Sequence, residues 1–231
     1  YKCDFLFSRN LMRMISSLRF LSVLVCFFIG WLDSSMAATT AAPPAYVRKG
    51  LVILDAGHGG YDLGAHNQFC EEKVIALRTT MLVKKYLLDK GYRVMLSRQD
   101  DTFIPLKERA LHANRIHAKV FVSIHYNAAR NASAHGIEVF YYDKILDWRM
   151  HSSKRLASCI LSKLLDKTHA ASRGIKGGNF LVIRETSMPA ILVEAGFITN
   201  SEECKKLRDP SYINCIAKAI ADGIDKFCIS H

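Results

Sequence analysis

The sequence predicts an α/β fold, an open and mostly parallel twisted sheet of about six strands with helices on both faces. Three observations support this fold class. Beyond residue 50, apolar runs of strand length alternate with longer amphipathic segments. The first run, "LVILDA" at 51–56, is continuously apolar, as in a strand that is covered on both faces. The 231 residues, 50% apolar and 23% charged, suffice for one hydrophobic core.

Local patterns define the next predicted elements in order. The segment 71–91 carries apolar residues at helical spacing, and Gly91 ends it. A strand is expected at 92–98. A helix is expected at 105–118, where Pro105 is a favourable first-turn residue. The apolar residues that predict the first of these helices are Val74, Leu77, Met81 and Leu88.

The second half of the chain repeats the alternation. Apolar runs predict strands at 119–128, 136–143, 179–185 and 190–197. Amphipathic patterns predict a long helix at 147–169 and a closing helix at 209–228. Because the carboxyl ends of parallel strands meet at one edge of a sheet, we expect ligands to bind there.

The N-terminal segment has the pattern of a secretory signal peptide, which we expect over 1–37. Arg13 and Arg19 precede an apolar run at 20–32, and small residues follow it. The run is shorter than the roughly 20 apolar residues of a spanning helix, so we expect no stable membrane insertion after cleavage. A buried helix or an uncleaved anchor remain alternatives. A periplasmic or secreted protein is predicted.

The start of the sequence and the segment after the leader complete the domain prediction. The sequence begins with Tyr1, and Met12 or Met14 is the expected start of translation. Small and Pro-containing residues predict a linker at 38–47. One globular domain is then expected over 48–231.

The net charge indicates an anionic partner. The chain carries +11 at pH 7, and residues 1–37 hold four basic and two acidic side chains, which leaves +9 for the rest. A basic exported protein suits nucleic acid, a membrane surface or a carboxylate-rich wall polymer. Nucleic acid is disfavoured, since no basic cluster is interleaved with aromatic residues. A solvated basic surface without a partner remains an alternative.

The cysteines exclude two kinds of scaffold. Five of them remain after residue 37, an odd number, and no CxxC spacing occurs, which argues against a zinc ribbon and a pure disulfide framework. The sequence allows one bridge without indicating which residues pair. These cysteines are Cys70, Cys159, Cys204, Cys215 and Cys228.

Five side chains of catalytic type, two of them alternative glutamates, lie just after predicted strands or at the start of a helix. His58 follows the first strand, and His125 and Glu194 stand near the ends of two later ones. Glu71 and Glu72 open the first helix. We therefore expect two imidazoles and two carboxylates to converge at one edge of the sheet.

This combination of side chains indicates a catalytic zinc site. Two histidines and one carboxylate leave a fourth position on zinc for water, and a further carboxylate can act as general base. The histidines have a structural alternative as hydrogen-bonded residues, and Glu71 and Glu72 as acidic residues favoured by the helix dipole. Glu194 is different, because a carboxylate that ends a buried strand needs a partner or carries a function. A phosphate cradle is disfavoured because the glycines around His58 miss the G-x-G-x-x-G spacing.

Seven motifs in order resemble one family, the zinc-dependent N-acetylmuramoyl-L-alanine amidases of the amidase type 3 family. These are cell-wall hydrolases that separate daughter cells and turn over peptidoglycan. The resemblance runs from about residue 51 to the last helix. The motifs are "LDAGHGGYDLGA", "EEKVIAL", "SRQDD", "LKERALHAN", "FVSIHYNAA", "RGIKGGNFLVIRE" and "PAILVEAGFITN".

The resemblance implies the site residues and the reaction. It implies one zinc ion held by His58, Glu72 and His125; Glu72 is chosen over Glu71 because the family's ligand glutamate directly precedes a lysine. It implies Glu194 as the catalytic carboxylate. The substrate implied is peptidoglycan or a muropeptide, cut at the amide between N-acetylmuramic acid and L-alanine.

Three further matches and one departure qualify the resemblance. Arg109, Asn114 and Asn127 match family positions, and we expect structural hydrogen bonds from them. Regulated members carry an extra helix that plugs the zinc site before the "RG" motif. Here 142–173 holds about one long helix, so we expect an open site that needs no activator.

Two rival functions remain at this point. One is another zinc peptidase on the same scaffold, such as a carboxypeptidase that trims stem peptides. The other is a wall-binding protein without catalysis, which we disfavour because all four site positions are filled.

Overall fold

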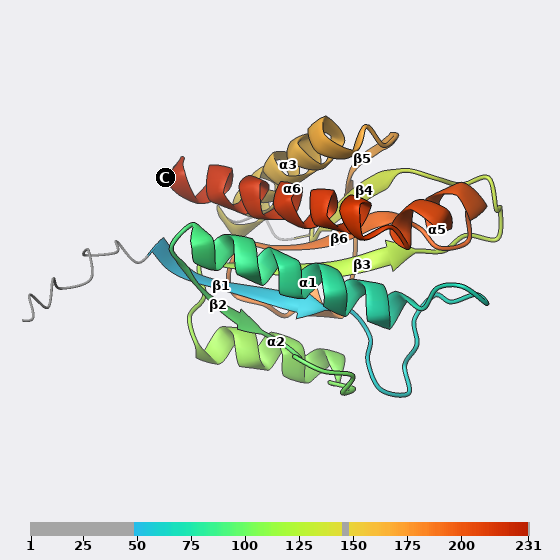
Figure 1. Ribbon diagram of the computed structural model, residues 1–231. Coiled ribbons are helices and arrows are strands. Elements are labelled where there is room, and N and C mark those ends of the chain that lie inside the picture. The colour runs from blue at the N-terminus through green and yellow to red at the C-terminus, as the bar shows by residue number, and fades with distance from the viewer. Residues whose placement is uncertain (1–48, 145–147, 231) are drawn as a thin grey trace, which may run out of the picture. The chain divides into compact units, whose positions relative to one another are not determined.

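The described residues, 49–144 and 148–230 of a computed structural model, form one mixed sheet with helices on both faces (Figure 1). The strand order is β2-β1-β3-β6-β4-β5. Neighbouring strands from β2 to β6 are parallel, β4 runs antiparallel to β6, and β5 is parallel to β4. The strands are β1 Lys49–Ala56, β2 Tyr92–Leu96, β3 Val120–Asn127, β4 Ile137–Tyr141, β5 Ser172–Gly177 and β6 Ala190–Phe197. The predicted fold class is confirmed.

The helices form two layers around this sheet. Helices α1, α3 and α6 lie on one side of it in Figure 1, and α2 lies on the other. The predicted helices at 71–91, 105–118, 147–169 and 209–228 are confirmed within a few residues. The bounds are α1 Glu72–Asp89, α2 Leu106–Arg115, α3 Trp148–Thr168, α4 Leu181–Arg184, α5 Ser201–Leu207 and α6 Pro210–Ile229.

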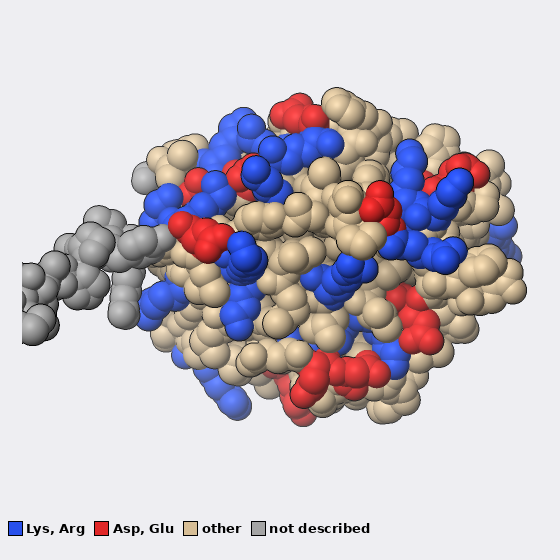
Figure 2. Space-filling model, in the orientation of Figure 1, with Lys and Arg blue, Asp and Glu red and all other residues tan. Residues whose placement is uncertain are grey.

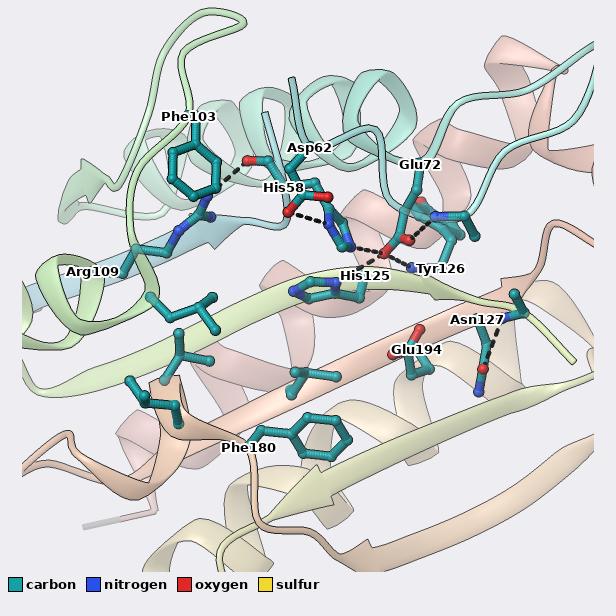
Figure 3. Close-up of a pocket in the computed structure, with 16 residues that line it drawn as sticks. His58, Asp62, Glu72, Phe103, Arg109, His125, Tyr126, Asn127, Phe180 and Glu194 are labelled. Atoms are coloured by element: carbon teal, nitrogen blue, oxygen red, sulfur yellow. Dashed lines mark hydrogen bonds and ion pairs between the residues drawn. The ribbon is translucent and has the colours of Figure 1, made fainter. Parts of the chain in front are cut away.

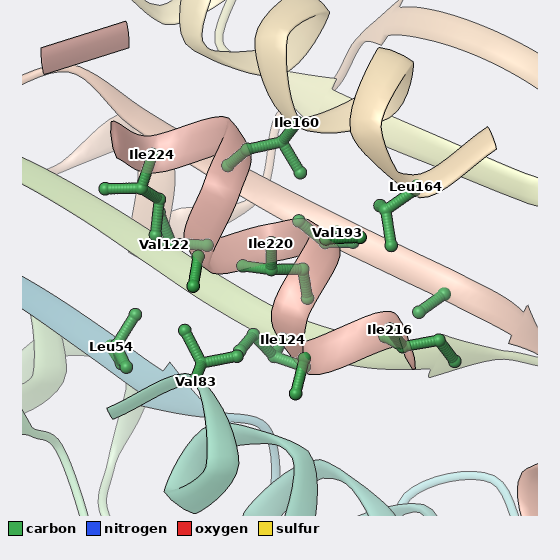
Figure 4. Packing of buried hydrophobic residues seen from close by; sticks show 14 of the residues in the cluster. Leu54, Val83, Val122, Ile124, Ile160, Leu164, Val193, Ile216, Ile220 and Ile224 are labelled. Atoms are coloured by element: carbon green, nitrogen blue, oxygen red, sulfur yellow. The ribbon is translucent and has the colours of Figure 1, made fainter. Parts of the chain in front are cut away.

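Two apolar clusters cover the faces of the sheet. Residues of β1, β3 and β6 pack with α1, α3 and α6 in the larger cluster, including Val83, Ile160 and Ile220 (Figure 4). The smaller cluster lies on the opposite face and includes Phe121 and Ile183. Successive residues of β1 alternate between the two clusters, which explains why its sequence is continuously apolar.

The predicted strand at 179–185 is wrong. Residues Leu181–Arg184 form the short helix α4, whose Val182 and Ile183 are buried in the smaller cluster. A short apolar run fits either a strand or one buried helical turn, and here tertiary packing decides for the helix. One edge strand is instead Ser172–Gly177, which the sequence pattern missed because Ile175 is its single apolar residue and none of its residues is fully buried.

The apolar stripe that predicted α1 is not its buried face. Val74, Met81 and Leu88 are exposed. The buried face includes Thr79 and Thr80, whose hydroxyls donate to carbonyls one turn earlier and thereby hide the true periodicity. Its buried apolar members include Ile75, Ala76, Val83 and Leu87.

Surface charge is dispersed over the face of the molecule that Figure 2 draws. Figure 2 shows Lys and Arg side chains spread over this face, with acidic side chains between them. No described helix is long and apolar enough to cross a membrane. The predicted signal peptide at 1–37 and linker at 38–47 lie outside the described residues.

Candidate metal centre and active site

The predicted site residues lie together at the carboxyl ends of β1, β3 and β6. They line a cavity of about 580 Å³. The β3–β6 register pairs His125 with Glu194, so these two residues are neighbours across the sheet. His58 lies just beyond β1, and Glu72 is the first residue of α1. Figure 3 shows the four side chains in one pocket.

Three potential ligand atoms converge in this pocket. Oε1 of Glu72 lies 3.0 Å from Nε2 of His58 and 2.8 Å from Nδ1 of His125. Within the described residues, these three form a cluster whose ligand atoms all lie within 4.8 Å of one another. Glu71, the alternative glutamate, is exposed and does not line the pocket.

The donor set fits a divalent ion of the zinc type. Two imidazoles and a carboxylate are the ligands of many catalytic zinc sites. Glu72 is 4% exposed, and its oxygens are oriented by the N–H groups of Ala65 and Tyr126. Nδ1 of His58 lies 2.9 Å from Oδ2 of Asp62. A second carboxylate therefore orients this imidazole through the ring nitrogen that does not face Glu72.

Two glycines make room for the candidate ligands. A Cβ at Gly57 would lie 2.4 Å from the ring of His125. A Cβ at Gly64 would lie 2.6 Å from both Glu72 and His58, and Gly64 has φ +66°. Any larger residue at either position would displace these candidate ligand side chains, which explains the glycine-rich sequence around His58.

The charges in the pocket favour an ionised Glu72. Burial raises the pKa of Glu72, but its hydrogen bonds with His125 and His58 outweigh burial and hold that pKa well below its usual value. Burial lowers the pKa of His58, but the carboxylates of Glu72 and Asp62 outweigh it and raise that pKa. The carboxylates therefore favour a positive charge at this imidazole, and a bound cation would satisfy the same preference.

Glu194 stands in an unusual environment for a carboxyl group. Its Oε2 is buried and has no hydrogen-bond partner among the described residues. Burial, followed by the charges of Glu72 and Glu138, raises the pKa of Glu194 well above its usual value. A buried carboxyl group with a raised pKa in a pocket is typical of a general acid or base.

Glu138 is the cross-strand partner of Glu194, and Glu138 has polar partners of its own. Asn127 donates to its Oε1 at 2.6 Å. Arg173 and Lys176 of β5 form ion pairs with its Oε2. Asn127 therefore has the structural hydrogen bonding that the sequence analysis expected of it, although it also lines the pocket.

Arg109 supports the loop that carries His58. Its guanidinium is buried and donates to the carbonyls of Ala56 and His58, and it pairs with Asp55 at 2.9 Å. Asn114 lies outside the pocket lining. Its side chain bonds the backbone of Glu185 and Ser187, which joins α2 to the segment after α4.

Sequence reasoning missed several residues of the site. Asp62 was detectable, since it follows His58 by four residues in the "GHGGYD" motif. Arg98 was not detectable, because it acts through hydrogen bonds to the carbonyls of Gly57 and Lys73, and these contacts depend on long-range packing. The apolar wall of the pocket was also missed; it includes Phe103, Leu106, Phe180, Leu181, Val182 and Leu192.

Comparison with known proteins identifies the family. The sequence profile described as N-acetylmuramoyl-L-alanine amidase matches residues 52–226. Bacillus subtilis YqiI, described as uncharacterized, is 40% identical over 194 residues, which cover 82% of this chain and 92% of YqiI. The Bacillus subtilis N-acetylmuramoyl-L-alanine amidase LytC is 39% identical over 172 residues, 74% of this chain but only 34% of LytC.

A solved structure shows the same fold. The N-acetylmuramoyl-L-alanine amidase from Clostridium difficile 630 is 38% identical, with a TM-score of 0.75, and the match covers 79% of this chain and 98% of that one. The profile match spans the strands and helices that hold the pocket. The chain therefore belongs to the N-acetylmuramoyl-L-alanine amidase family.

Proposed function

We propose that this chain cuts the amide bond between N-acetylmuramic acid and L-alanine in peptidoglycan with one zinc ion held by His58, Glu72 and His125. One observation carries the proposal: the three donor atoms converge beside the buried and unpartnered carboxyl group of Glu194. When bound, zinc would lower the pKa of water and polarise a carbonyl group.

Glu194 is the proposed general base and acid. Its carboxylate would accept a proton from the attacking water and pass it to the nitrogen of the leaving L-alanine. The raised pKa suits this exchange, because the group holds a proton at higher pH than an ordinary glutamate does. Its unpartnered Oε2 remains available for that proton.

The shape and charge of the molecule support an anionic wall polymer as substrate. The cavity of about 580 Å³ has an apolar wall that includes Phe103, Leu106 and Phe180. This wall suits the lactyl and alanyl methyl groups next to the scissile bond. The stem peptide carries carboxylates, which the excess positive charge of the chain attracts.

Two substitutions test the proposed roles. Glu194→Ala should retain zinc and lose about 10²–10⁴-fold in turnover, since the ligands remain and the proton acceptor is gone. His125→Ala should lose zinc, as measured by elemental analysis of the purified protein. Unchanged turnover in Glu194→Ala on purified muropeptides would refute the mechanism.

Product analysis separates this reaction from its rival. Mass spectrometry of digested muropeptides should show release of whole stem peptides from the glycan. Loss of single amino acids would instead indicate a carboxypeptidase and would contradict the proposed bond.

Export and domain organisation are part of the proposal. The pattern at 1–37 directs the chain out of the cytoplasm, the linker at 38–47 follows, and the catalytic domain occupies 48–231. The wall substrate lies on that side of the membrane. N-terminal sequencing of the exported protein should find a start near residue 38, and an intact leader would contradict this division.

A further inference from the structure

A pair of buried cysteines lies outside the pocket that contains His58, Glu72 and His125. Sγ of Cys70 lies 2.8 Å from Sγ of Cys204, although 134 residues separate them in the sequence. The two cysteines are 5% and 4% exposed. This separation is shorter than the roughly 3.5–4.0 Å between carbon atoms in contact, and sulfur is the larger atom. No other described pair of cysteines has its sulfurs within hydrogen-bonding distance.

The pair lies between the loop that carries His58 and the segment after β6. Cys70 precedes the proposed ligand Glu72 by two residues, and Cys204 belongs to α5. Asn67 links the same two segments: its Nδ2 donates to the carbonyl of Ile198 at 3.0 Å, and its Oδ1 accepts from the N–H of Cys70 at 2.9 Å. The thiols are thus aligned by neighbouring hydrogen bonds.

Helix α5 is firmly attached to the sheet. The carboxylate of Glu203 accepts from the N–H groups of Gly136 and Phe197 at 2.9 and 2.7 Å. Asn200 caps the helix by accepting from the N–H of Glu203. The loop 57–71, between β1 and α1, carries both His58 and Cys70 and is called the metal loop below. A bond from Cys204 to Cys70 would therefore connect this loop to the sheet.

One residue of the pair borders a cavity from which a small reagent would approach. Cys70 lines this cavity of about 460 Å³, which is distinct from the metal pocket, and Cys204 does not line it. Arg78 and Arg208 line the same cavity. Two guanidinium groups suit an anionic disulfide reagent such as oxidised glutathione.

We propose that Cys70 and Cys204 form a disulfide bond that fastens the metal loop to α5. The thiolate of Cys70 attacks a small-molecule disulfide and releases one thiolate. Cys204 then attacks the Cys70 sulfur of the mixed disulfide and releases the second. The two cysteine protons end on the two released thiols, and the reagent gains the two electrons. The inference goes beyond amide hydrolysis and rests only on the proposed export into an oxidising compartment.

Peptide mapping tests the bond directly. The protein is refolded with oxidised and reduced glutathione, its free thiols are blocked with iodoacetamide, and it is cut with trypsin. Cys70 is the only cysteine of tryptic peptide 50–73, and Cys204 is the only one of 185–205. The two peptides should appear as one linked species that a reducing agent separates. Alkylation of both cysteines after refolding, or a bond to Cys215 instead, would overturn the proposal.

Thermal unfolding gives an independent measurement. A bond across 134 residues restricts the unfolded chain strongly. Reduction of the wild type should lower Tm by about 5–10 °C. The Tm of Cys204→Ser should equal that of the reduced wild type, with or without oxidant. The Tm of Cys159→Ser should fall on reduction by the same amount as that of the wild type. Equal Tm values for oxidised and reduced wild type would contradict the proposed fastening, and this comparison needs no variant to fold.

The amidase assay distinguishes this inference from the proposed function. Full activity on muropeptides without a linked peptide would refute the disulfide alone. A linked protein that binds zinc and cuts no muropeptide would refute the hydrolysis alone.

Discussion

At the scale of single residues, the site depends on carboxylates that support other side chains. Glu72 lies between two imidazoles, and Asp62 lies behind one of them. Glu138 holds Asn127 beside the pocket, while Asp55 holds Arg109 beneath it. Each of these contacts joins residues from different elements or turns, so the chemistry of the pocket depends on several packed partners.

Asp62 should control metal affinity. In Asp62→Asn, the imidazole of His58 loses its ionised partner, and zinc affinity should fall about 10–100-fold. Competition with a fluorescent zinc chelator measures this change. Asp166→Asn, an exposed change on α3, is the matched control and should leave affinity unaltered. Equal affinity in both variants would show that Asp62 does not support the ligand.

Because of the ion pair between Asp55 and Arg109, the free energy of unfolding should decrease at acidic pH. Burial raises the pKa of Asp55, but the charge of Arg109 and the hydrogen bond from Ser123 outweigh it, so that pKa lies below its usual value of 3.8. A carboxyl whose pKa is lowered by folding stabilises the protein above its unfolded pKa. This contribution is lost as the pH falls from about 3.8 through the folded value.

Urea unfolding of the metal-free protein between pH 2.5 and 7 measures this dependence. Asp55→Asn should be less stable at pH 7 by about 3–5 kcal/mol, because Arg109 stays buried without its partner. Its free energy of unfolding should also fall less steeply below about pH 4 than that of the wild type. Parallel curves for the two proteins would contradict the assignment.

At the scale of elements, a local pattern identifies a helix or strand more reliably than the face that it buries. Helix α1 was predicted from an exposed stripe, because its buried face contains threonines that bond to their own helix. The run 179–185 is apolar enough for a strand, yet four of its residues form a helical turn. In both cases the neighbouring elements decide what is buried.

Two substitutions on α1 test which face is structural. Leu87 is fully buried and Met81 is exposed. Leu87→Ala should lower the free energy of unfolding by about 2–5 kcal/mol, since it leaves a cavity under the sheet. Met81→Ala should change it by less than about 0.5 kcal/mol. Urea unfolding measures both, and a reversed order would contradict the packing of α1.

At the scale of the whole molecule, the open pocket bears on regulation. Between β4 and β5 the described residues form only α3, which packs against α6, β4, β5 and β6. The walls of the metal pocket come from other segments. Nothing in the described part of this connection covers the cavity in the way a plugging helix would.

The zinc-loaded protein should therefore cut purified peptidoglycan sacculi with no partner added. Release of soluble muropeptides measures the reaction, and Glu194→Ala prepared in the same way is the control. Absence of cleavage by protein of verified zinc content would show that an activator is required.

The sequence by itself determined the alternation of strands and helices and the positions of His58, His125 and Glu194 near strand ends. It did so because parallel strands bring their carboxyl ends to one edge, whatever the details of packing. The resemblance to a family then selected Glu72 over Glu71.

Only the tertiary structure decided the direction of β4 and β5, the helical form of α4 and the buried face of α1. It also decided the partners of the site, from Asp62 beside His58 to Cys204 beside Cys70. Local periodicity shows only which residues are apolar. Strand direction, the buried face of a helix and the partners of the site residues depend on contacts between segments far apart in the chain. Such contacts exist only after the layers have packed together.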